Sequence, residues 1–164
     1  MPALSIYSSL GLPDWLRGMQ AAMSAQQACV LISLVKVQGS VPREAGARML
    51  VSEDTCIGTI GGGHLEWKAI QHAKTLLLQH QAISSLETFT LGPQLDQCCG
   101  GVTTIHYESF PLGHITWLET LIQRWQQGLS TGLKSYPQVW PNTGRPRALV
   151  EATKSPATIE LSEL

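Results

Sequence analysis

The chain has 164 residues, of which 43% are hydrophobic and 14% are charged, and its formal net charge is −1. This length suits one domain with its own core, or a domain with an appendage. The near-neutral charge provides no electrostatic footprint for DNA or RNA. The longest apolar run, 28–35, is too short to cross a membrane, and 1–15 lacks the basic and apolar regions of a secretory signal. We therefore expect a cytoplasmic protein with four reduced cysteines.

The hydrophobic spacing alternates along the chain between the helical and the extended period. In chain order it predicts helix 14–27, strand 28–37, strands 48–52 and 56–60, helix 64–80, strands 85–91 and 102–107, helix 115–127, and strands 136–140 and 148–150. This alternation predicts an α/β fold, with a mixed β-sheet flanked by helices in a single compact domain.

A loop with positive charge follows the first long strand. It contains Gly39, Ser40, Pro42 and Arg43. Arginine offers a planar fork of donors that suits phosphate and carboxylate, so Arg43 is a candidate for neutralising an anionic ligand. The alternative is an ordinary solvated surface arginine.

Three consecutive glycines, Gly61, Gly62 and Gly63, stand between a predicted strand and a predicted helix. Free N–H groups and the positive end of the helix dipole favour an anion at such a junction. The segment is neither a P-loop, since no Lys-Ser/Thr follows, nor the Gly-x-Gly-x-x-Gly fingerprint of dinucleotide-binding folds. A tight turn that needs glycine for conformational reasons alone is the alternative. Glu66 lies in the first helical turn, where the dipole favours a carboxylate, and it could also anchor an arginine.

Two adjacent cysteines, Cys98 and Cys99, run directly into Gly100 and Gly101. Thiolates are soft metal ligands and strong nucleophiles, and the glycines allow close approach of a large ligand. A disulfide between neighbours would be strained, and the wide spacing of the cysteines, with no Cys-x-x-Cys, excludes a zinc ribbon. The alternative is a pair of small buried hydrophobic residues. We expect the chemistry of the protein at this segment.

Three segments, 39–50, 58–66 and 97–101, resemble in the same order the motifs of the N-terminal domain of the XdhC/CoxI family. The resemblance covers roughly residues 20–110. Members of that family are maturation factors of molybdenum hydroxylases such as xanthine dehydrogenase. The resemblance implies that the chain binds the molybdenum cofactor, a pterin with a dithiolene and a terminal phosphate, as molybdopterin or its dinucleotide form. It further implies that the chain protects this cofactor, supports its sulfuration and delivers it.

The resemblance also implies which residues bind the cofactor. They are Ser40, Arg43, Gly61, Gly62, Gly63, Glu66, Gln97, Cys98, Cys99, Gly100 and Gly101. Cys98 and Cys99 would touch the metal or relay sulfur, and an accessory factor of this kind has no catalytic residue of its own. The implied partners are a molybdenum hydroxylase target subunit and a cysteine desulfurase. A homo-oligomer stays open, because subunits could shield a large cofactor between them.

We expect an XdhC/CoxI-like domain over 1–110 and a C-terminal appendage over 111–164. The appendage has a predicted helix and strands but no Rossmann fingerprint, whereas typical family members continue into a nucleotide-binding-like domain.

Two other classes of function remain open. In a thiol or sulfur-transfer enzyme, a cysteine nucleophile would need a histidine base within hydrogen-bond reach. The candidate bases are His64, His72, His80, His106 and His114. In a nucleotide-binding or scaffold module, an exposed surface around Trp117 and Trp125 would recruit a partner.

Overall fold

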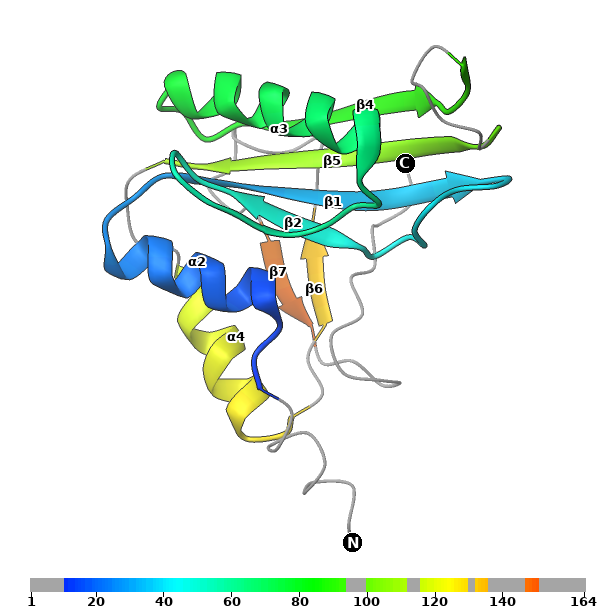
Figure 1. Cartoon of the computed structure of the whole chain (residues 1–164). Coiled ribbons are helices and arrows are strands. Elements are labelled where there is room, and N and C mark those ends of the chain that lie inside the picture. The colour runs from blue at the N-terminus through cyan, green and yellow to red at the C-terminus, as the bar shows by residue number, and fades with distance from the viewer. Residues whose placement is uncertain (1–10, 94–99, 112–115, 130–131, 136–146, 151–164) are drawn as a thin grey trace, which may run out of the picture.

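Five strands form a central sheet in the order β3-β2-β1-β5-β4 (Figure 1). They are β1 (Cys29–Gln38), β2 (Arg48–Val51), β3 (Cys56–Gly58), β4 (Ser84–Thr90) and β5 (Val102–Phe110). The helices are α2 (Asp14–Ser24), α3 (Gly63–Leu78) and α4 (Thr116–Gln126), and a separate ribbon pairs β6 (Gly132–Ser135) with β7 (Arg147–Val150). The computed structural model describes residues 11–93, 100–111, 116–129, 132–135 and 147–150.

The α/β class with helices on the sheet is confirmed, but the prediction of a mixed sheet is wrong. All four strand pairs of the central sheet are antiparallel. Helix α3 does join two strands that run in the same direction, β3 and β4, as a crossover helix does. These strands lie at opposite edges of the sheet, with three strands between them, so they form no parallel pair.

Strand β1 is the middle strand of the sheet, and its first six residues are all buried. It pairs along its whole length with β5, from Cys29 opposite Phe110 to Gln38 opposite Val102, with a register irregularity between Leu34 and Lys36. Its other edge pairs with β2. A continuous run of β-branched and aliphatic residues is what a strand covered on both faces requires.

Helix α3 covers one face of the sheet, above it in Figure 1. Its buried stripe consists of Leu65, Ala69, Ala73 and Leu76. These residues pack with alternate sheet residues, among them Ile32 and Tyr107, in one hydrophobic cluster. The spacing of these four residues, i, i+4, i+8 and i+11, places them on one face of the helix.

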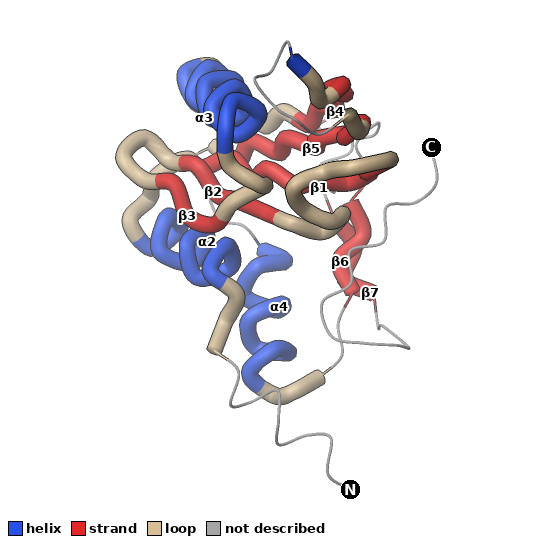
Figure 2. Tube along the Cα trace, turned by 45° about the vertical axis from the view of Figure 1, so that its right-hand side comes forward, coloured by secondary structure: helices blue, strands red, loops and turns tan. Residues whose placement is uncertain are grey.

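Helices α2 and α4 cover the opposite face, as Figure 2 also shows. Leu16 and Met19 of α2 and Leu118 and Leu121 of α4 are buried in a second cluster. The sheet contributes residues of the alternate set, such as Leu31, to this cluster. The molecule thus has three layers, with one helix above the sheet and two below.

The predicted boundaries differ from the structure at strand ends and at the end of α2, which stops at Ser24 rather than at residue 27. Strand β3 ends at Gly58, two residues early, because Gly58 has a φ of +87°. Strand β5 continues three residues beyond the prediction, to Phe110, since β1 offers it pairing partners to the end. The sequence missed β6, and the predicted strand 136–140 lies outside the described residues. None of the described helices combines the length and the apolar character that crossing a membrane would require.

Candidate functional site

The first and third motifs meet at one end of the sheet, where β1 ends and β5 begins. Gly101 is buried directly against the turn that follows β1. A methyl group on Gly101 would overlap the carbonyl oxygen of Ser40 and lie 2.6 Å from that of Gln38. Likewise, a methyl group on Gly39, which has a φ of +72°, would lie 3.3 Å from the Cα of Gly101. Only glycines allow the two backbones to approach this closely.

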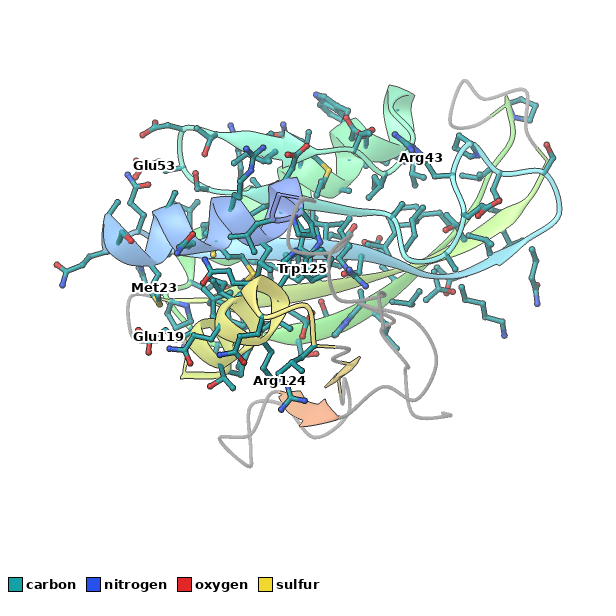
Figure 3. All side chains as sticks on the ribbon, turned by 90° about the horizontal axis from the view of Figure 1, so that it is seen from below. Met23, Arg43, Glu53, Glu119, Arg124 and Trp125 are labelled. Atoms are coloured by element: carbon teal, nitrogen blue, oxygen red, sulfur yellow. The ribbon has the colours of Figure 1, made fainter. Side chains whose placement is uncertain are left out.

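The second motif contacts the same loop from its other side. A methyl group on Gly61 would lie 2.7 Å from Cγ of Pro42 and 3.5 Å from Cγ of Arg43. Gly61 also has a φ of +125°, which L side chains rarely adopt. The loop 39–43, which belongs to the first motif, is therefore held between Gly61 of the second motif and Gly101 of the third. Ser40 and Arg43 are exposed there, and Figure 3 shows Arg43 beside the first turn of α3.

Glu66 holds the turn that leads into α3. Its Oε2 atom accepts hydrogen bonds from the Ile60 and Gly62 N–H groups, each at 3.0 Å, and from Oγ1 of Thr59 at 2.5 Å. Oγ1 of Thr59 in turn accepts a hydrogen bond from the Gly61 N–H at 3.1 Å. The carboxylate acts as the glutamate of a capping box does, reaching back to the N–H of the residue before the helix.

This network bears on the prediction that the N–H groups of the glycine turn bind an anionic ligand. The N–H groups of Ile60 and Gly62 already bind an anion, and that anion is the Glu66 carboxylate of the chain itself. A ligand phosphate at the same two groups would displace the carboxylate and meet its negative charge. The role of Glu66 that the structure shows is to fix the turn, and no bond between Glu66 and an arginine is part of this network among the described residues.

The double cysteine itself lies outside the described residues, together with Gln97. The exposed Gly100 follows Cys99 directly in the chain and leads into the buried Gly101. Of the predicted cofactor-binding residues, the structure brings together those of the first two motifs and the two glycines of the third.

The two remaining cysteines differ in accessibility. Cys29 is 1% exposed in the cluster beneath the sheet, and burial raises the pKa of its thiol to about 12. Cys56 is exposed on β3. Within the described part of the chain, no group of three or more His, Cys, Asp or Glu side chains could hold a metal ion.

Most of the histidines that the enzyme alternative names as candidate bases lie away from the three motifs. The His72 ring packs against Tyr107, with ring centroids 4.6 Å apart. His106 is 1% exposed, and its Nε2 lies 2.7 Å from Oγ of Ser84 in a hydrogen bond. His80 follows the far end of α3, and His114 lies outside the described residues. Among the histidines that the structure describes, His64, in the first turn of α3, is the one beside these motifs.

The surface that the scaffold alternative requires is only partly accessible. Trp117 is 7% exposed and packs with Phe110 beneath the sheet, at a centroid distance of 6.0 Å. Trp125 is half-buried. The aromatic stripe of α4 is therefore largely core, as a stripe at helical spacing usually is.

A cavity of about 560 Å³ lies at the other end of α3, away from the motifs. Its lining includes Glu53, Lys74, Leu77 and the candidate base His80, but none of the predicted cofactor-binding residues. A helix rises about 1.5 Å per residue, so the 16 residues of α3 separate its two ends by roughly 24 Å. In Figure 3, Glu53 of the cavity lining lies toward one side of the molecule and Arg43 toward the other.

Sequence reasoning missed Trp67 and Thr59 at the converging motifs. Thr59 was hidden because its role is a hydrogen bond to a side chain seven residues later. Trp67 offered a signal, since it is a large aromatic residue off the apolar stripe of α3, and it is 57% exposed.

The fold and the converging motifs define a small α/β domain that carries its candidate site on loops at one end of an antiparallel sheet. The model of the XdhC and CoxI family matches residues 22–90 of this chain. This match confirms the resemblance predicted from the motifs. The first two motifs fall within the matched residues, and the double cysteine follows them in the chain.

A solved structure described as a xanthine dehydrogenase from Bacillus halodurans has a similar fold, with a TM-score of 0.54 and 21% sequence identity. The similarity covers 69% of this chain and 34% of the other, so the chain spans about a third of the length of that protein. A comparison with curated proteins found no match.

Proposed function

We propose that the chain is an accessory factor in the maturation of a molybdenum hydroxylase, and that it binds the molybdenum cofactor rather than turning over a substrate. The observation that carries this proposal is the close contact of the loop 39–43, from the first motif, with Gly61 of the second motif and Gly101 of the third. The family match over residues 22–90 supports a role in the maturation of a molybdenum enzyme. In this proposal the chain works in the cytoplasm, protects the cofactor and hands it to the target subunit.

The described residues fit the anionic part of this ligand. The exposed Arg43 and Ser40 lie on one loop, and their guanidinium and hydroxyl donors suit a phosphate. Since Glu66 already occupies two N–H groups of the glycine turn, we assign the phosphate to the Arg43 side of the loop. Glu66, Gly61, Gly62 and Gly63 then shape the site rather than neutralise the ligand.

Cys98 and Cys99 complete the proposed site, with Gln97, Gly100 and Gly101. Thiolates are soft donors that match a thiophilic metal, and Gly101 holds the end of this segment against Ser40. When bound, the cofactor supplies a molybdenum centre whose oxygen can be exchanged for sulfur. A cysteine desulfurase is the proposed source of that sulfur, and we leave open a homo-oligomer that would shield the cofactor.

The test measures molybdenum and pterin bound to the purified chain after anaerobic loading under reducing conditions. We expect near-stoichiometric binding by the wild type and loss in a Cys98→Ala/Cys99→Ala variant. Cys56→Ala is the matched control, because it removes an exposed thiol on β3. Full binding by the double variant would show that the thiols are not part of the cofactor site. No binding by the wild type would reject the proposed function.

A further inference from the structure

Trp67 is the most exposed aromatic side chain beside the converging motifs, with 57% of its surface accessible. It follows Glu66, whose carboxylate fixes the turn, and therefore stands on the first turns of a well-anchored helix. The core of the protein does not explain it, because the buried stripe of α3 passes through Leu65 and Ala69 instead. Folding gains little from an aromatic residue left this exposed.

The indole lies toward the loops rather than toward the middle of α3. Helical side chains tilt toward the N-terminus of their helix, so Trp67 lies over the turn that contains Gly63 and His64. Gly63, four residues earlier on the same helical face, has no side chain to cover the ring. The His64 ring contacts the indole at a centroid distance of 5.5 Å and an interplanar angle of 62°, which supports the indole from one side.

An arginine side chain lies beside the glycine turn that precedes α3. Arg43 approaches Gly61, two residues before α3, with its Cγ 3.5 Å from where a side chain would start. An aromatic surface and a guanidinium on adjacent segments are the two parts needed to hold a flat nitrogen heterocycle that carries a phosphate. The ring stacks and the phosphate pairs with the cation.

We propose that Trp67 is the stacking platform for the planar heterocycle of an anionic ligand, with Arg43 holding its phosphate. This inference rests on the proposed function, in which the ligand is the molybdenum cofactor. The heterocycle is then either the pterin or, in a dinucleotide form, the nucleobase, and both share the same flat π-face.

The experiment compares binding to the full-length chain of four probes: anaerobically released molybdenum cofactor, 6-hydroxymethylpterin, GMP and CMP. We expect Trp67→Ala to weaken binding of the stacked probe about 5- to 150-fold, the range that base–aromatic stacking provides. Trp67→Phe keeps a π-face and should retain most of the affinity. Leu78→Ala is the matched control, since it removes a side chain that is 78% exposed at the other end of α3.

The four probes show whether the stacked ring is the pterin or the nucleobase, and they separate the role of Trp67 from that of Arg43. A loss confined to cofactor and 6-hydroxymethylpterin assigns the pterin to Trp67, and a loss for GMP or CMP assigns the nucleobase. Arg43→Ala should weaken the phosphate-bearing probes and spare 6-hydroxymethylpterin, which has no phosphate.

Failure of this inference is distinct from failure of the proposed function. Equal cofactor binding by wild type and Trp67→Ala overturns the platform and leaves the function standing. Trp67-dependent binding of a pterin or nucleotide without retention of the cofactor keeps the platform and rejects the function. Absence of binding for all four probes overturns both.

Discussion

At the scale of single residues, the cysteines show how burial decides chemistry. Cys29 and Cys56 are the same residue type, yet one thiol is 1% exposed and the other is open to solvent. Only the thiolate reacts readily, and desolvation disfavours it. The sequence alone could not separate these two cysteines, because the burial of Cys29 depends on packing of α4 far along the chain.

We predict that iodoacetamide at pH 8 alkylates Cys56 and leaves Cys29 unmodified in the folded protein. Burial raises the pKa of Cys29 from its ordinary value of 9.0 to about 12, so the folded chain keeps this proton longer than the unfolded chain does. Cys29 therefore stabilises the fold fully below about pH 9, and this contribution falls as the pH rises toward 12. Peptide mass spectrometry provides the readout, with urea-unfolded protein as the control; rapid labelling of Cys29 in the folded state would contradict the prediction.

At the scale of elements, the junction between β5 and the loop after β1 depends on one close backbone approach. We predict that Gly101→Ala destabilises the fold by about 1–3 kcal/mol, the usual range for overpacking, because its Cβ would overlap the carbonyl oxygen of Ser40. The measurement is the free energy of unfolding in urea.

Gly100→Ala is the matched control for this prediction. Nothing lies within 4 Å of the Cβ that it would add, and the residue is exposed. It should change the free energy of unfolding by less than about 0.5 kcal/mol, as surface substitutions usually do. Equal effects of the two variants would show that the close approach does not hold the loop.

At the scale of the whole molecule, α4 belongs to the core beneath the sheet. Leu118 is fully buried and packs in the cluster with Leu16 and Met19 of α2. We predict that Leu118→Ala lowers the free energy of unfolding of the entire chain by about 2–5 kcal/mol, in one transition that includes the sheet. The measurement is urea unfolding followed by circular dichroism.

Glu119→Ala, an exposed change at the next residue of α4, is the control for this variant. If Leu118→Ala leaves the unfolding of the sheet unchanged, residues 111–164 behave as the separate appendage that the sequence predicts. The division at residue 110 stays a prediction until that measurement.

The sequence predicted most helices and strands because their periodicity is local. The stripe of α3 and the buried run of β1 are examples. It could not predict the antiparallel sheet, because the relative direction of neighbouring strands depends on which strands pair. The two strands that α3 joins, β3 and β4, run in the same direction but do not pair with each other.

The candidate site was predicted as three motifs, and their meeting at one loop was not derivable from spacing. That meeting depends on β1 pairing with β5 in a register that sets Gln38 opposite Val102. The hydrogen bonds of Glu66 were equally out of reach, since the sequence places it near the glycine turn without showing that it binds there.

The loop 39–43 packs closely against Gly101 on one side and against Gly61 on the other. Much of its conformational entropy is therefore lost when the protein folds rather than when a ligand arrives. Binding at a preorganised loop therefore has a smaller ordering cost, and differences in affinity lie mainly in how slowly the ligand leaves. In the proposed function, where the chain holds a labile cofactor and then releases it, the target subunit would have to shorten the residence time of the cofactor.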